Sequence, residues 1–166
     1  TAGILAALNA RHTTGRGDHI EVNLLSSILS GMVNQTSAFV AGDAVPRRMG
    51  NAHPSLYPYE PFATADHDLV LAVGNDAQFG RLCAVLGVPE AADDPRYASM
   101  AGRNEHRAEL RALLSERLRT RNADEWFQLL REVGVPSGPI LGVDEGVRFA
   151  ERLGLDPIVA AGRGSR

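Results

Sequence analysis

The chain has 166 residues, of which 44% are hydrophobic and 22% charged, with a formal net charge of −3 at pH 7. This composition is ordinary for one folded domain and excludes disordered, collagen-like and disulfide-scaffold proteins. The charge gives no positive surface for nucleic acid or an anionic membrane, so we expect neither partner. The single cysteine, Cys83, can form no internal disulfide, and its scarcity favours a reducing, cytoplasmic location.

Both ends of the chain have unusual patterns. Residues 1–9 resemble the middle of an apolar helix with no capping residue before it, and residues 159–166 end in a loop. We therefore expect an internal piece of a larger polypeptide.

The first third of the sequence predicts two helices around a short strand. The first helix runs to about Arg11, a turn covers 13–17, and the alternation of His19–Val22 predicts a strand. From Asn23 to Ala41, apolar residues recur at helical spacing, and no residue in this span is charged. A solvent-facing helix normally carries charges, so we expect one long buried helix at a domain junction or subunit interface.

The middle of the chain predicts a loop followed by a hairpin. Residues 42–61 lack periodicity and predict a long ordered loop. Two strands follow, Tyr59–Ala63 and Leu69–Val73, joined by a turn over 64–68.

The last part of the chain is mostly helical. Capping patterns mark helix starts at Asn75, with Gln78 three residues later, and at Asn122, with Glu125. Other expected elements are an amphipathic helix over 103–119, a strand at Ile140–Leu141 and a last helix over 144–152. The fold class is mixed α/β, of the α+β kind: a helix-rich domain with a small antiparallel sheet.

Three polar or reactive groups have simple structural explanations. Cys83 lies on the apolar side of a predicted helix, which favours a core residue over a nucleophile. Asp66-His67-Asp68 suggests a metal or acid–base site, but a solvated hairpin turn is the preferred interpretation. The five histidines lack metal-ligand spacing, so we expect no metal.

Arg103, Arg107 and Arg111 form a stripe on one predicted helix. Glutamates share this helix, so the simplest interpretation is a solvated face.

The segment Pro46–Tyr59 is the strongest candidate for binding. Loops with such mixed polar and aromatic content are often functional. Gly50 permits close backbone approach, the amides near Asn51 can donate to a carboxylate or oxyanion, and His53 can hydrogen-bond or carry a proton. Tyr57 and Tyr59 can form the wall of an organic ligand site. An irregular loop packed over the long helix is an equally good interpretation.

An ordered set of motifs carries a family resemblance. These are GRGDHIEVN at 15–23, the uncharged helix, PRRMGNAHPSLYPYEPFATADHDLVLAVGN at 46–75, DDPRY at 93–97 and GVPSGP at 134–139. In this order they resemble the class III CoA-transferase family, which includes formyl-CoA transferase, carnitine CoA-transferases and α-methylacyl-CoA racemases. The resemblance extends over essentially the whole chain.

The resemblance implies an interlocked homodimer whose subunits have a large Rossmann-like domain and a smaller α/β domain. It implies transfer of CoA between an acyl-CoA and a carboxylic acid through an Asp-acyl anhydride and a thioester, with CoA as substrate and product and no permanent cofactor. That Asp would precede Gly3–Leu8, so this chain contains no catalytic residue and is expected to be inactive alone. A racemase, or a non-catalytic assembly or binding module, remains as an alternative.

The resemblance also implies an assignment of segments and site residues. Residues 1–22 would be a remnant of the large domain, 23–50 the long helix and linker, 51–152 the small α/β domain and 153–166 a return linker. Asn51–Tyr57 corresponds to a Gly-rich loop over the active site in oxalate-linked transferases, and here Asn-Ala-His-Pro replaces consecutive glycines. The expected substrate-binding residues are Gly50, Asn51, Ala52, His53, Pro54, Tyr57 and Leu24.

Overall fold

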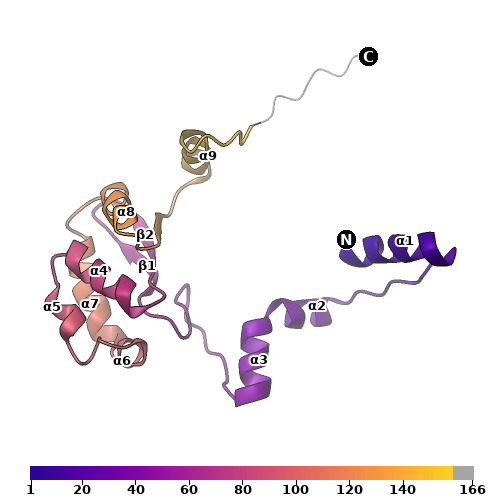
Figure 1. The fold of residues 1–166 in the computed structure, drawn as a ribbon, viewed down its shortest axis with the longest axis horizontal. Helices are drawn as coiled ribbons and strands as arrows, with labels where there is room; N and C mark the ends of the chain where they lie inside the picture. The colour runs from indigo at the N-terminus through magenta and orange to yellow at the C-terminus, as the bar shows by residue number, and fades with distance from the viewer. Residues whose placement is uncertain (159–166) are drawn as a thin grey trace. The chain divides into compact units, whose positions relative to one another are not determined.

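The computed structural model describes residues 1–158. The chain divides into two compact units, and the boundary between them lies between Arg48 and Met49 (Figure 1). The expected loop at 159–166 and the end of the expected return linker lie outside the described residues.

The first unit begins with helix α1 (Ala2–Thr14). The helix ends at Gly15, whose φ of +67° lets its N–H donate to the carbonyl of Arg11 at 2.8 Å. The chain after it, 16–23, contains no strand, so the predicted strand at His19–Val22 is wrong. Alternation alone does not make a strand, because a strand also needs a hydrogen-bonded neighbour.

The predicted single helix over 23–41 is two helices, α2 (Leu24–Gly31) and α3 (Val33–Gly42). They meet at Met32, whose ψ of +30° leaves the helical range, and Figure 1 shows them running in different directions. The expectation of burial is not met within this chain, because no residue of α2 or α3 is buried. The exposed apolar side chains of these two helices are Leu24, Leu25, Ile28, Leu29, Met32, Val33, Phe39 and Val40.

The second unit contains a three-stranded antiparallel sheet in the order β1-β2-β3. Strands β1 (Tyr59–Ala63) and β2 (Asp68–Ala72) form the predicted hairpin, with Phe62 opposite Leu69. The third strand, β3 (Ser137–Pro139), comes earlier than predicted; the expected strand residue Ile140 adds only an N–H bond to the carbonyl of Asp68 at 2.9 Å.

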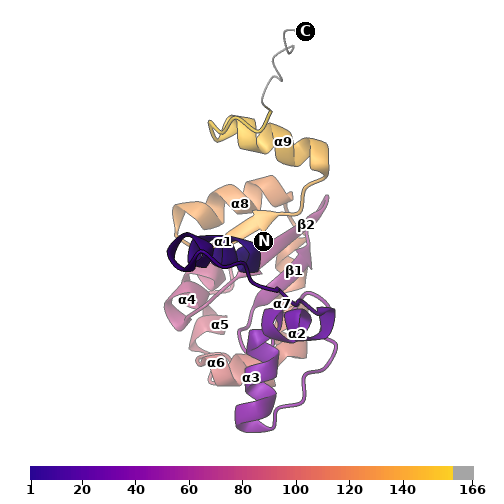
Figure 2. The same cartoon turned by 90° about the vertical axis from the view of Figure 1, so that its right-hand side faces the viewer.

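The helices of the described part of the second unit are, in chain order, α4 (Asp76–Val85), α5 (Glu90–Asp93), α6 (Met100–Glu105), α7 (Arg107–Leu118), α8 (Ala123–Glu132) and α9 (Val143–Arg152). Helix α7 contacts β1, whereas α8 contacts β2 and β3 (Figure 2). The predicted helix over 103–119 is divided into α6 and α7 at His106. The fold class, a helix-rich α+β domain with a small antiparallel sheet, is confirmed.

The two predicted capping patterns have different outcomes. The Asn75 side chain accepts from the N–H of Gln78 at 2.9 Å, and the Gln78 side chain accepts from Gly74. The helix start predicted at Asn122 is confirmed, because α8 begins at Ala123, but Asn122 makes no side-chain cap bond; a carboxylate from the hairpin, Asp66, accepts from the first N–H of α8 instead.

The core of the second unit is one cluster. It joins strands β1 and β2 to helices α4, α7 and α8 through Phe62, Leu69, Leu82, Leu114 and Trp126, among others. None of the helices among residues 1–158 is long and apolar enough to cross a bilayer.

Replacing Leu114 tests this core. Leu114 is fully buried on α7, so Leu114→Ala is expected to lower the free energy of unfolding by about 2–5 kcal/mol. The matched control is Leu113→Ala, whose half-buried side chain is expected to contribute only about 1 kcal/mol. Urea unfolding measures both, and equal effects would contradict the assignment of Leu114 to the core.

Candidate functional site

The candidate loop, residues 50–57, begins with a tight turn in the second unit. The N–H of Ala52 donates to the carbonyl of Met49 at 3.2 Å, and Gly50 has a φ of +62°, a conformation that favours glycine. The next N–H, from His53, donates to the carbonyl of Tyr59 at 2.9 Å. The loop is therefore tied to the start of β1.

The His53 side chain organises the centre of the loop. Its Nδ1 accepts from the N–H groups of Ser55 at 3.1 Å and Leu56 at 3.0 Å. Its ring stacks on Tyr59 with centroids 5.1 Å apart. A nitrogen that accepts two N–H bonds carries no proton, so these partners assign the neutral tautomer with the proton on Nε2.

Three side chains from α6 and α7 hold the loop backbone at alternate carbonyls. Arg107 donates to the carbonyl of His53 at 2.8 Å, and Asn104 donates to that of Ser55 at 2.7 Å. Arg103 donates to the carbonyl of Tyr57 through Nε at 3.0 Å. These three bonds fix the loop backbone at every second residue from His53 to Tyr57.

Arg103 is the most deeply buried of these side chains, with no exposed surface. It also donates to the carbonyl of Tyr97 at 2.8 Å and to the Asp76 carboxylate at 2.6 Å, and its guanidinium lies over the Phe79 ring. A buried cation needs such partners.

The expected solvated arginine face is therefore wrong for two of its three members. Arg103 is buried and Arg107 is half-buried against the loop. Arg111 is half exposed and pairs with Glu60 at 2.6 Å. The only signal for this role in the sequence is the spacing of four residues between these arginines.

The predicted substrate-binding residues occupy different environments. Gly50, Asn51 and Pro54 are exposed, and Ala52 and His53 are half-buried. No hydrogen bond among the described residues uses the N–H of Gly50 or Asn51. Leu24 is 88% exposed and belongs to the first unit.

Tyr57 faces inward rather than toward solvent. Its side chain is buried with Arg107 over its ring, and its hydroxyl has no hydrogen-bond partner among the described residues. Burial, and then the nearby Glu60 carboxylate, raise the pKa of Tyr57 well above its usual value. Tyr57 thus supports the loop from beneath in this chain.

Cys83 is a core residue, as predicted. It is fully buried on α4, and burial raises the pKa of its thiol to about 12. A thiol of this kind is a poor nucleophile.

Asp66 joins the hairpin turn to helix α8. Its Oδ1 accepts from the Thr64 hydroxyl at 2.8 Å, the N–H of His67 at 2.8 Å and the N–H of Ala123 at 2.9 Å. These bonds, with that from Ala123 the largest contribution, lower the pKa of Asp66. Among residues 1–158 no three His, Cys, Asp or Glu side chains are grouped to hold a metal.

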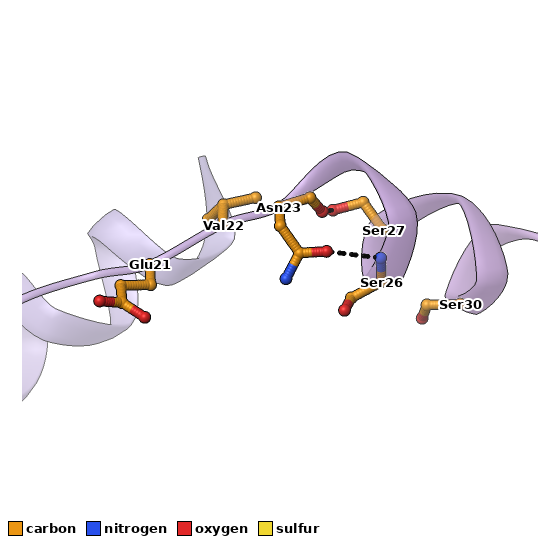
Figure 3. Close-up of a pocket in the computed structure, with 6 residues that line it drawn as sticks. All are labelled: Glu21, Val22, Asn23, Ser26, Ser27 and Ser30. Carbon is orange, nitrogen blue, oxygen red and sulfur yellow. Dashed lines mark hydrogen bonds between the residues drawn. The ribbon is translucent and has the colours of Figure 1, made fainter.

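The first unit has an open polar hollow at the start of α2 (Figure 3). The Asn23 side chain accepts from the N–H of Ser26 at 2.7 Å, and the Ser27 hydroxyl donates to the Asn23 carbonyl at 2.8 Å. These bonds cap the helix, so the polar groups at the hollow serve the helix end itself. Its lining residues are Glu21, Val22, Asn23, Ser26, Ser27 and Ser30.

Comparison with known proteins identifies the family. The model of CoA-transferase family III matches residues 1–153, so the chain belongs to this family. An acetyl-CoA:oxalate CoA-transferase from Acetobacter aceti is 34% identical over 96% of this chain and 41% of its own length. A succinate–glutarate CoA-transferase from Agrobacterium fabrum is 40% identical over 87% of this chain and 36% of its own length. The chain thus spans about two fifths of these relatives.

Solved structures agree with this assignment. A CaiB/BaiF family protein from Brucella suis is 40% identical, with a TM-score of 0.73 over 94% of this chain and 39% of its own. A hypothetical protein from Mycobacterium tuberculosis is 27% identical, with a TM-score of 0.73 over 90% of this chain and 40% of its own.

Replacing Arg103 tests the buried anchor. Arg103→Lys keeps the charge but cannot reach three separate acceptors, so we expect a loss of about 2 kcal/mol of unfolding free energy. Arg96→Lys is the control, because Arg96 makes half-exposed ion pairs that contribute less than about 1 kcal/mol. Equal effects in denaturant unfolding would show that Arg103 is no special anchor.

Asp66 predicts a pH dependence of stability. Because its pKa is lowered in the folded state, its contribution is present above the ordinary Asp pKa of about 4 and is lost as the pH falls below it. The difference in melting temperature between the native protein and Asp66→Asn is expected to shrink between about pH 5 and 2.5. Asp124→Asn, in the first turn of α8, is the control. A difference independent of pH would contradict the role of the carboxylate.

Proposed function

We propose that the protein containing this chain is an acyl-CoA:carboxylate CoA-transferase. The observation that carries the proposal is the match of residues 1–153 to CoA-transferase family III, together with relatives at 34–40% identity that are CoA-transferases. The substrates are an acyl-CoA and a carboxylic acid.

The reaction balances without a cofactor. A nucleophilic aspartate outside this chain attacks the thioester carbonyl, forming an acyl anhydride and releasing the CoA thiolate. The thiolate then attacks the aspartyl carbonyl of the anhydride, which releases the first acid and leaves an aspartyl-CoA thioester. The second carboxylate attacks this thioester, which forms a second aspartyl-acyl anhydride and again releases the CoA thiolate. The thiolate then attacks the acyl carbonyl of this anhydride, which gives the new acyl-CoA and regenerates the free aspartate.

The loop contributes binding to this chemistry. The exposed N–H groups of Gly50 and Asn51 donate to a carboxylate or to the oxyanion of the addition steps. Ala52, His53 and Pro54 shape the site, with Tyr57 as its support. These residues fill the place of a glycine-rich loop, so we propose a different acyl specificity from that of the oxalate-linked enzymes.

The first unit contributes assembly and one apolar contact. We propose that its exposed apolar helices, α2 and α3, are covered in an interlocked homodimer, with residues 1–22 belonging to the large domain and 51–152 to the small one. Leu24 lies against the thioester in this arrangement. The single, buried cysteine supports a reducing, cytoplasmic location.

An assay of the full-length protein tests the proposed function. With succinyl-CoA or acetyl-CoA as donor and glutarate as acceptor, we expect the acceptor's CoA thioester to form, and we expect an enzyme-bound CoA thioester that hydroxylamine cleaves; oxalate is expected to be the poorer acceptor. The 166-residue chain alone is expected to give no turnover. Loss of the α-proton of a 2-methylacyl-CoA in D2O without CoA transfer would favour the racemase. If neither reaction occurs, the result favours an assembly role.

A further inference from the structure

We propose that His53 donates a hydrogen bond through its Nε2–H to the carboxylate of the acid substrate, and that Arg107 and Asn104 are the positioning residues that hold it there. The inference rests on the proposed CoA transfer and deepens it by naming the side chain that recognises the acid.

Nε2 is the nitrogen of the His53 ring that is available to a ligand. Nδ1 of His53 is occupied by the N–H groups of Ser55 and Leu56, whereas Nε2 has no partner among the described residues. The ring is thus a neutral N–H donor of fixed orientation, stacked on Tyr59. A carboxylate accepts from such a donor.

The part of the loop around His53 is accessible to a ligand. His53 is half-buried, while Asn51, Pro54 and Ser55 around it are exposed. The neighbouring N–H of Asn51 is also without an internal partner. The loop therefore presents side-chain and backbone donors but no acidic group between residues 49 and 59, which suits an anion.

Side chains of α6 and α7 fix the His53 ring in place. The Arg107 guanidinium donates to the His53 carbonyl at 2.8 Å and lies 5.0 Å from the centre of the Tyr57 ring. It also donates to the side-chain oxygen of Asn104, whose amide holds the Ser55 carbonyl. Arg107 thus fixes the backbone of His53. Asn104 fixes Ser55, whose N–H donates to the His53 ring.

Replacing His53 separates recognition from loop structure. In His53→Asn the side-chain oxygen can still accept from the N–H groups of the loop, but the amide N–H of this shorter side chain does not reach the position of the Nε2 donor. In the full-length enzyme, we expect the KM for the acid to rise about tenfold, the effect of losing one hydrogen bond to a charged group, with kcat changed less than about threefold. An unchanged KM would show that His53 only shapes the loop.

Replacing Arg107 tests positioning. Arg107→Gln is expected to raise the KM for the acid about tenfold as well. Arg111→Gln is the matched control: it lies one turn later on α7 and stacks over Phe62, but it pairs with Glu60 rather than with the loop, and its KM is expected to stay unchanged. If Arg107 acts through His53, the double variant is no worse than the single ones. Multiplied effects would overturn this coupling.

A measurement independent of turnover distinguishes the two proposals. With 15N-labelled histidine, the His53 ring is expected to show a proton on Nε2 only, and glutarate is expected to shift the Nε2 signal in the native enzyme but not in Arg107→Gln. A protein that shows this shift but transfers no CoA contradicts the proposed function alone. A protein that transfers CoA without this shift contradicts the role of His53 alone.

Discussion

The buried guanidinium of Arg103 is the interaction on which the second unit's organisation depends. It bonds the carbonyls of Tyr57 and Tyr97 and reaches the carboxylate of Asp76. These partners come from the candidate loop, the turn before α6 and the first turn of α4. Burying a cation is unfavourable without such bonds, so the three segments are held in one arrangement or the charge is left unsatisfied.

The same arrangement determines the conformation of the candidate loop. Arg103 bonds the carbonyl of Tyr57 at the end of the loop, and Asn104 and Arg107 bond the carbonyls of Ser55 and His53 in its middle. The His53 ring completes the structure from within by accepting two N–H bonds of the loop. The loop backbone is therefore bonded at three carbonyls, although the loop belongs to no sheet.

Local patterns in the sequence predicted the elements of the second unit well. The hairpin, the cap at Asn75 and the burial of Cys83 are short-range or periodic features, and they were confirmed. The role of Arg103 and Arg107 was missed, because each bonds a carbonyl about fifty residues away, and nothing in the spacing of charges reports an unsatisfied carbonyl elsewhere. The single helix expected over 23–41 and the strand expected at His19–Val22 were also wrong, because helix breaks and strand pairing depend on neighbouring structure rather than on periodicity. The segment was correctly predicted to be a loop, but the inward position of Tyr57 required the structure.

The fastening of the loop has a thermodynamic consequence. Ordering a free backbone costs roughly 1–2 kcal/mol per residue in conformational entropy. Because the carbonyls of His53, Ser55 and Tyr57 are bound by helices of the same unit, that entropy is lost when the unit folds. A ligand that meets the loop afterwards finds it preorganised, and more of the contact energy remains as affinity. A glycine-rich loop in the same place would lose that freedom at each encounter with its ligand.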